Sequence, residues 1–204
     1  MRRQVEMALQ RLAGFENPVA RLEQYETPPG LASDILQFAW GNGDLDGRVL
    51  DLGCGTGVLG VGAALYGARV VGVDVDGGAL RVGRENAATT GVFDRIDWVQ
   101  GEVSDLPVAR VETVVMNPPF GAQNEGADRV FLRAAATVAD VAYTIHNAGS
   151  LGFVEAFVDD GEVTDAFGAS LVVPRRFEFH EEDEREIDVE VYRIEFGGGS
   201  DTDD

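Results

Sequence analysis

Short apolar runs alternate with amphipathic segments through the middle of the chain. Strand-like runs, rich in Val, Ile and Leu, occupy residues 48–52, 69–75, 96–100, 111–116 and 141–146. Helical patterns, with apolar residues every three or four positions, occupy residues 57–66, 77–90, 127–138 and 149–159. Uninterrupted apolar strands are typical of parallel sheets covered on both faces. Their alternation with helices predicts right-handed βαβ units in a doubly wound sheet.

The N-terminal segment precedes this alternation. Residues 1–15 are amphipathic and predict a helix, and the polar residues 22–27 then form a connector. Pro28 and Pro29 open a second helix, because proline suits the first turn, where its missing N–H is not needed. Thr27 is the predicted cap of that helix.

The pattern changes again in the last third of the chain. Residues 163–173 and 187–196 read as two successive strands joined by a charged loop, which predicts an antiparallel pair. We therefore expect a single α/β domain over residues 1–196, with a seven-stranded, mostly parallel sheet and an antiparallel final strand. A helical extension over about residues 1–45 precedes the sheet, and the acidic tail 197–204 is predicted to be disordered.

Composition narrows the class of protein. The chain has 204 residues, of which 45% are apolar, and it has no long apolar window or signal-peptide pattern. These features predict a soluble protein of the cytoplasm without a membrane segment. Cys54 is the only cysteine and cannot form an internal disulfide. With only two histidines, His146 expected in the core and His180 in a loop, no metal site is predicted.

The charge is extreme. The formal net charge is −20, from 36 acidic and 16 basic residues, and all the basic residues are arginine. A lysine-free, acidic surface is typical of proteins from molar salt, which predicts a halophilic archaeal source. At about 1 M salt the Debye length is only about 3 Å, so phosphate contacts release few counterions. The lack of a basic patch therefore does not exclude an RNA substrate.

A rigid polar motif follows the apolar run at residues 111–116. Its residues are Asn117, Pro118, Pro119 and Phe120, and the two prolines end the strand because neither donates a ladder hydrogen bond. Asn117 and the Pro118 carbonyl could each accept one hydrogen bond from a planar amino group, while Phe120 stacks on the ring that carries it. The motif therefore predicts a catalytic site for such a group, and the alternative is a surface turn with a stray aromatic side chain.

A glycine-rich loop follows the first strand of the sheet. Gly53, Gly55 and Gly57 separate the strand at 48–52 from a helix. Glycines allow the backbone N–H groups and the helix N-terminus to approach a ligand closely. The loop is therefore predicted to bind a cofactor.

Acidic residues at the strand ends suggest which cofactor this is. Residues 55–60 also fit the GxGxxG pattern of a nicotinamide dehydrogenase, but Asp51 at the strand end suits a cationic amino-acid group better than a pyrophosphate. Asp74 ends the next strand, where it can accept hydrogen bonds from a ribose diol of either cofactor. Glu102 follows the third strand.

The glycine loop resembles motif I of S-adenosylmethionine-dependent methyltransferases, and together with NPPF it resembles enzymes that methylate amino groups. Narrower signals resemble the methyltransferase-like protein five family over nearly the whole chain. The matching strings are LEQYETPP, DLGCGTGVLGVGA, GVDVD, VVMNPPFG, YTIH, and RFEFH with IDVEV. This resemblance implies a Rossmann-like class I methyltransferase fold and methylation of adenine N6 in small-subunit ribosomal RNA.

The resemblance also implies roles for individual residues. S-adenosylmethionine would be covered by Gln24, Tyr25 and Thr27, and Asp51 and Gly53 would line its methionine portion. Asp74 would hold its ribose, and Glu102 and Val103 its adenine. Family members work with a small zinc-binding activator subunit that adds a strand to the sheet edge. An exposed apolar patch at residues 96–99 would support such a partner here.

Some positions depart from the family pattern, and other functions fit the motifs. Residues 181–186 are acidic where the family has a basic run, Asn147 replaces an expected lysine, and Glu102 replaces an aspartate. An alternative enzyme is a glutamine-N5 methyltransferase acting on a translation release factor, although that group more often has tyrosine in place of Phe120. A non-catalytic partner with a methyltransferase fold is an alternative of another class.

Overall fold

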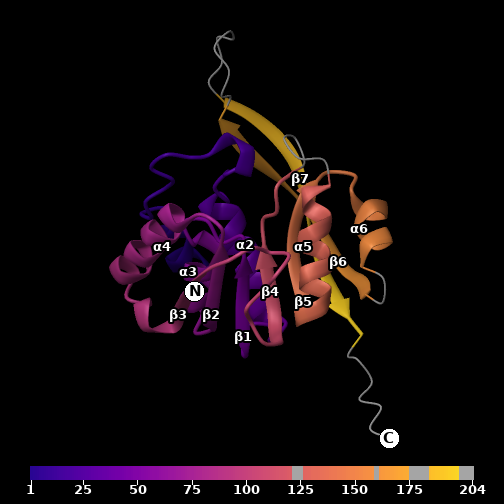
Figure 1. The fold of residues 1–204 in the computed structure, drawn as a ribbon, viewed down its shortest axis with the longest axis horizontal. Helices are drawn as coiled ribbons and strands as arrows, with labels where there is room; N and C mark the ends of the chain where they lie inside the picture. The colour runs from indigo at the N-terminus through magenta and orange to yellow at the C-terminus, as the bar shows by residue number, and fades with distance from the viewer. Residues whose placement is uncertain (121–125, 159–160, 175–183, 198–204) are drawn as a thin grey trace, which may run out of the picture.

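Seven strands form one central sheet in the computed structural model, which describes residues 1–120, 126–158, 161–174 and 184–197 (Figure 1). In spatial order the strands are β3 (Ile96–Gln100), β2 (Arg69–Asp74), β1 (Arg48–Leu52), β4 (Val111–Met116), β5 (Ala139–Asn147), β7 (Glu184–Phe196) and β6 (Gly161–Pro174). This arrangement confirms the α/β class I methyltransferase fold expected from the sequence.

The strand order reverses beside β1, and this reversal places the site. β1 pairs in parallel with β2 on one side and with β4 on the other, so Leu50 lies opposite both Val71 and Val114. The chain leaves these three strands at the same edge of the sheet. In a doubly wound sheet, ligands bind in the crevice outside this edge, at the point where the strand order reverses.

The last two strands close the sheet as an antiparallel pair. β7 runs antiparallel to both β5 and β6, as expected for the final strand. Both strands extend beyond the predicted bounds, and a register shift interrupts the β6–β7 ladder between Val163 and Asp165. Residues 175–183, which include His180 and the RFEFH string, lie outside the described residues, as do the first three residues of the acidic run at 181–186 and most of the tail.

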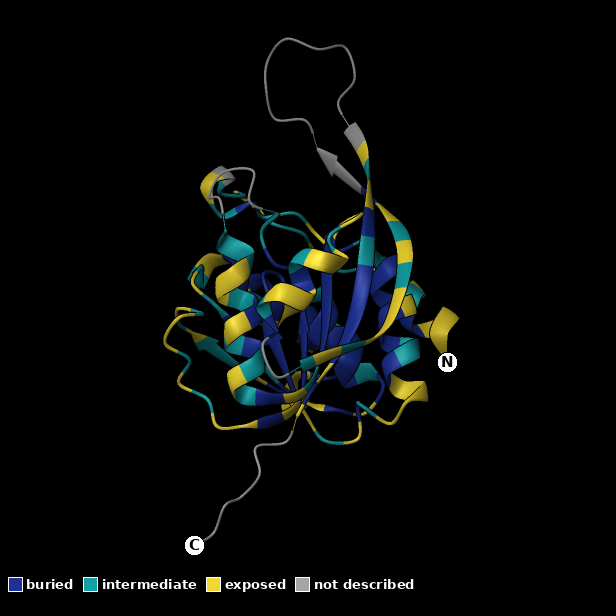
Figure 2. Cartoon of the chain, turned by 90° about the vertical axis from the view of Figure 1, so that its right-hand side faces the viewer, coloured by how far each residue is buried: buried dark blue, intermediate teal, exposed yellow. Residues whose placement is uncertain are grey.

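Six α-helices cover the two faces of the sheet in the described part of the chain. They are α1 (Arg2–Leu9), α2 (Pro29–Gly41), α3 (Val58–Leu65), α4 (Gly77–Thr90), α5 (Ala127–Val138) and α6 (Leu151–Phe157). Helices α1–α4 pack over one apolar cluster, and α5 and α6 pack over a second cluster on the opposite face. The middle strands β1, β4 and β5 are largely buried between them, whereas the edge strand β6 is mostly exposed or half-buried (Figure 2). None of the described helices is both long and apolar enough to cross a membrane.

The N-terminal segment differs from its prediction. The first helix ends at Leu9, and the side chain of Asn86 instead satisfies both backbone groups of Ala13. The cap predicted for α2 was wrong, because Pro28 occupies that position and no side chain makes a capping hydrogen bond. Thr27 turns away from the helix, and its hydroxyl contacts Asn117.

Candidate active site

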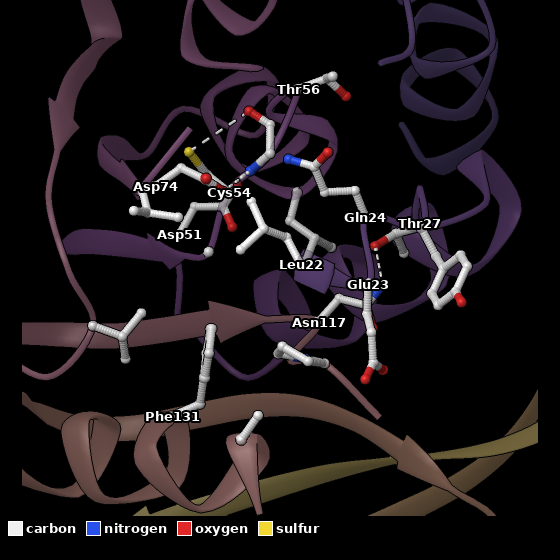
Figure 3. Close-up of a pocket in the computed structure, with 18 of the residues that line it drawn as sticks. Leu22, Glu23, Gln24, Thr27, Asp51, Cys54, Thr56, Asp74, Asn117 and Phe131 are labelled. Atoms are coloured by element: carbon white, nitrogen blue, oxygen red, sulfur yellow. Dashed lines mark hydrogen bonds between the residues drawn. The ribbon is translucent and has the colours of Figure 1, made fainter. Parts of the chain in front are cut away.

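A cavity of about 380 Å³ opens at the carboxyl edge of the sheet, where the strand order reverses (Figure 3). Its walls come from the N-terminal connector, the loops after β1, β2, β3 and β4, and the first turns of α5. Most of the predicted site residues line it: Gln24, Tyr25, Thr27, Asp51, Gly53, Gly55, Asp74, Glu102, Val103, Asn117 and Pro119. Residues far apart in the sequence are thus brought to one cavity.

The remaining predicted site residues do not line the cavity. Gly57 is the left-handed cap of α3, and the ring of Trp98 packs against its backbone. Pro118 is buried, and Phe120 is half-buried and packs against the apolar core. The loop at residues 121–125, which directly follows Phe120, lies outside the described residues.

Two aromatic side chains explain why the loop after β1 needs glycine. A Cβ on Gly53 would lie 2.7 Å from the ring of Phe131, and one on Gly55 would lie 2.7 Å from the ring of Phe15. Both glycines have positive φ, 71° and 52°, which side chains rarely adopt. Phe15 and Phe131 also line the cavity. Neither phenylalanine was predicted from the sequence as a site residue, where the only indication of them is the glycines that they contact.

Asp51 places an unpaired acidic group in this cavity. It is 2% exposed, and its Oδ2 accepts a hydrogen bond of 2.7 Å from the Gly60 N–H. Burial raises the pKa of Asp51 to about 7, and nearby Asp74 adds to the increase. In the described residues Asp51 has no cationic partner within ion-pair distance. A cationic ligand would therefore remove the penalty of burying this carboxylate.

Asp74 lies beside it at the end of β2. Its two oxygens accept hydrogen bonds from the N–H groups of Gly55 and Asp76, at 2.7 and 2.8 Å. Burial nevertheless raises the pKa of Asp74 above its ordinary value. The carboxylate is held in a fixed orientation, and its remaining lone pairs can accept hydrogen bonds from hydroxyl groups.

The connector is anchored to the start of α4. Asp76 caps this helix by accepting a 2.8 Å hydrogen bond from the Gly78 N–H. Gln24 donates a second hydrogen bond of 2.8 Å to Asp76, and this bond is the main cause of the lowered pKa of Asp76. The oxygen of Gln24 accepts a hydrogen bond from the Val19 N–H at 2.6 Å. Gln24 therefore fixes the connector over the cavity.

Asn117 lies at the other side of the cavity, at the end of β4. Its Nδ2 donates to the hydroxyl oxygen of Thr27 at 3.1 Å (Figure 3). Its Oδ1 is buried and, in the described part of the chain, has no hydrogen-bond partner. A buried amide oxygen without a partner is unfavourable unless a ligand supplies the donor.

Two other residues considered in the sequence, His146 and Cys54, are buried and have no sign of a catalytic role. His146 is 3% exposed, its Nε2 lies 2.9 Å from the Thr144 hydroxyl, and burial lowers the pKa of its imidazole to about 4. It is thus a neutral core residue, as expected. Cys54 is buried in the glycine loop, and burial raises the pKa of its thiol, which makes it a poor nucleophile.

The strand order, the glycine loop after β1 and the acidic ends of β1 and β2 together define a class I methyltransferase. The sequence model of the methyltransferase small domain matches residues 32–173. The chain belongs to this family, and it is an enzyme that uses S-adenosylmethionine. The cavity fits this cofactor, because Asp51 offers a buried carboxylate to a cation and Asp74 offers an acceptor to a ribose diol.

Relatives that match the chain over its length narrow the family further. The Danio rerio protein named rRNA N(6)-adenosine-methyltransferase METTL5 is 35% identical, with 95% of this chain and 97% of the relative covered. Its Drosophila melanogaster counterpart is 32% identical, with 96% of each covered. The crystal structure of PH1948 from Pyrococcus horikoshii superposes with a TM-score of 0.88 at 39% identity, covering 96% of this chain and 97% of that one. The chain thus belongs to the METTL5-type methyltransferases.

Proposed function

We propose that this enzyme transfers the methyl group of S-adenosylmethionine to the exocyclic N6 of an adenine in small-subunit ribosomal RNA. The observation that carries the proposal is the buried, unpartnered Oδ1 of Asn117 beside the cofactor cavity. An exocyclic amino group supplies the N–H donor that this oxygen lacks. The names of the METTL5-type relatives support adenine in rRNA as the source of that amino group.

The cavity walls suggest how the cofactor is held. Asp51 and Gly53 would contact its methionine portion, Asp74 its ribose, and Glu102 with Val103 its adenine. All of these residues line the cavity. Gln24, Tyr25 and Thr27 would cover it from the connector. When bound, S-adenosylmethionine supplies a methyl group already activated by the positive sulfur.

The residues at the end of β4 would then act on the acceptor nitrogen. Its lone pair is delocalised into the adenine ring, which makes it a poor nucleophile. By accepting a hydrogen bond from each of its two N–H groups, Asn117 Oδ1 and the Pro118 carbonyl would localise that lone pair and stabilise the positive charge that develops on nitrogen. The N–CH₃ bond would form as the S–CH₃ bond breaks, and the nitrogen would then lose one proton to water. The base must leave its stack to reach the site, at a cost of a few kcal/mol, and stacking on Phe120 would return about 1–3 kcal/mol.

We also propose a partner at the β3 edge of the sheet. β3 pairs only with β2 among the described strands, so its other edge can accept a strand from a small zinc-binding activator subunit. The patch expected at residues 96–99 is not exposed, because Ile96 is buried and Trp98 and Val99 are half-buried. Phe93, 53% exposed directly before the strand, is the apolar contact available to such a partner.

The acidic composition supports a halophilic archaeal source, and at high salt RNA binding would depend on base contacts more than on phosphate charge. A cytoplasmic location is proposed because the substrate would be ribosomal RNA. Methyl transfer from labelled S-adenosylmethionine in multimolar KCl tests the function. Small-subunit rRNA, large-subunit rRNA and release factor serve as acceptors, with and without the activator. We expect label in N6-methyladenosine of small-subunit rRNA. Label in large-subunit rRNA would keep the adenine-N6 activity but assign the substrate to the other ribosomal subunit. Label in a release-factor glutamine would overturn the proposal.

A further inference from the structure

We propose that Thr27 is a positioning residue for the reaction, since its hydroxyl holds the amide of Asn117 in the orientation that presents Oδ1 to the acceptor nitrogen. This role rests on the proposed function and adds to the part of Thr27 in covering the cofactor. The proposal starts from one hydrogen bond, in which Asn117 Nδ2 donates to Thr27 Oγ1 at 3.1 Å.

The surroundings of both side chains make this bond specific. Thr27 is 6% exposed, the Oδ1 atom of Asn117 is buried, and both residues line the cavity. Among the described residues, no other hydrogen bond to the amide of Asn117 is present. Thr27 is therefore the described side chain that pairs with the NH₂ end of this amide. The two residues are 90 positions apart in the sequence, and no local pattern links them.

The orientation of the amide matters because its two ends have opposite chemistry. In the observed orientation the oxygen is not the end bonded to Thr27, and it can accept a hydrogen bond from an N–H of the acceptor amine. A rotation of about 180° would turn the NH₂ group toward the acceptor instead, and an NH₂ group donates but does not accept. The Thr27 hydroxyl accepts from Nδ2 in the observed orientation, and it could donate to Oδ1 in the rotated one. Once the acceptor amine donates to the amide, however, only the observed orientation pairs both ends of the amide, Oδ1 with the amine and Nδ2 with Thr27.

The same connector also reaches the cofactor side of the cavity. Three residues before Thr27, Gln24 bonds to Asp76, which follows the acidic end of β2 at Asp74. One short segment thus contacts the ends of both β2 and β4. When the connector folds over the cofactor, it therefore also orients the Asn117 amide that would bind the acceptor nitrogen.

Two substitutions at one position separate this role from simple packing. Thr27→Val keeps the shape of the side chain and removes the hydroxyl, whereas Thr27→Ser keeps the hydroxyl and removes a methyl group. The matched control is Thr113→Val, which removes another threonine hydroxyl bond, to the Asp44 carbonyl at 2.6 Å, at the opposite end of β4. Each protein is measured in multimolar KCl for its thermal midpoint, its Kd for S-adenosylmethionine, and its single-turnover methyl-transfer rate at saturating RNA.

For Thr27→Val we expect a rate at least ~tenfold lower while the Kd stays within ~threefold of the parent, because the lost bond orients the acceptor site. Thr27→Ser should recover the rate to within ~threefold, and Thr113→Val should change only the thermal midpoint. A Thr27→Val enzyme with the parent rate would overturn the proposal. Parallel losses of cofactor affinity in both Thr27 variants would also overturn it, because Thr27 would then act on the cofactor alone.

Failure of this proposal is distinguishable from failure of the proposed function. If the parent enzyme methylates a glutamine amide instead of RNA adenine, the function is wrong, but the three variants can be compared on that acceptor, whose nitrogen is also planar. If the parent methylates RNA and Thr27→Val does so equally well, the function stands and the role of Thr27 fails.

Discussion

The amide oxygen of Asn117 combines two properties that seldom occur together in a folded protein. It is buried, and in the described part of the chain it has no hydrogen-bond partner. Such a group lowers stability, so its retention in a cavity wall indicates a function in binding. The carboxylate of Asp51 is also buried, and among the described residues it has a hydrogen-bond donor, the Gly60 N–H, but no cationic partner. Each group lacks what one of the two substrates would supply.

The first prediction at this scale concerns Asn117→Ala. Removing the amide should lower the methyl-transfer rate by roughly 10²-fold or more, as the loss of a transition-state hydrogen-bonding group typically does. The Kd for S-adenosylmethionine should remain within ~threefold, because a contact made only with the acceptor does not affect cofactor binding. Single-turnover transfer and calorimetry measure the two quantities. Ordinary turnover by this variant would exclude the proposed role of the amide.

The second prediction uses the pKa of Asp51, which burial raises from 3.8 to about 7. As the pH falls through about 7 the carboxyl becomes neutral and loses its attraction for a cationic cofactor. Affinity for S-adenosylmethionine should therefore fall below that pH, by up to ~tenfold per unit. The folding stability of the cofactor-free protein changes with pH in the opposite direction, because in this pH range the folded state binds more protons than the unfolded state. Its stability decreases as the pH rises from 3.8 toward about 7.

Asp51→Asn is the control for this pH dependence. Its affinity for the cofactor should be low and nearly independent of pH, because the amide does not titrate in this range. Titration calorimetry of both proteins at several pH values, at constant KCl, measures the difference. An unchanged pH profile in the variant would assign the titration to another group.

At the scale of the elements, the N-terminal segment is the part that crosses the cavity. Asn86 on α4 is 2% exposed and accepts a 2.8 Å hydrogen bond from the Ala13 N–H. Its Nδ2 donates to the carbonyls of Ala13 and Thr56, at 2.9 and 3.0 Å. One side chain thus ties the strap over residues 13–16 to the glycine loop. Phe15 of this strap forms part of the cavity wall.

The third prediction follows from this tie. Asn86→Ala removes all three hydrogen bonds and leaves the backbone groups of Ala13 without their partner. We expect the strap to open more often, which should weaken S-adenosylmethionine binding by ~tenfold, mainly through faster dissociation. Stopped-flow release of the cofactor measures this rate. Thr89→Ala, on the exposed side of the same helix, is the control and should release the cofactor at the parent rate.

The same segment shows what the sequence could and could not predict. The alternation of apolar runs and helices gave β1 to β5 and α3 to α5 with bounds within two residues of those observed, because each element is encoded by its own local pattern. The predicted end of α1 was wrong because the backbone groups of Ala13 bond to Asn86, which is 73 residues away in the sequence. The cap predicted at Thr27 was wrong because the helix begins one residue later than expected, with Pro28 at the cap position.

At the scale of the whole molecule, the surface charge determines how the stability of the folded protein depends on salt. The net charge of −20 is spread over a chain of 204 residues, in which 36 acidic residues outnumber 16 arginines. In dilute buffer the Debye length is about 10 Å, so neighbouring carboxylates repel one another across the folded surface. Unfolding separates them, and this favours the unfolded chain.

The last prediction follows from this repulsion. Raising KCl from about 0.1 M to about 1 M shortens the Debye length to about 3 Å, which screens most pairs on the surface. The thermal midpoint should therefore rise, on the order of 10 °C for a stabilisation of a few kcal/mol in a chain of this size. Buried groups such as Asp51 are screened much less, so the pH dependence of cofactor binding should persist at high salt.

Calorimetric scans across KCl concentrations measure the midpoint, with sucrose at matched osmolality as the uncharged control. A midpoint that rises equally in sucrose would attribute the effect to solvent exclusion rather than to charge, and one that falls in KCl would contradict adaptation to salt.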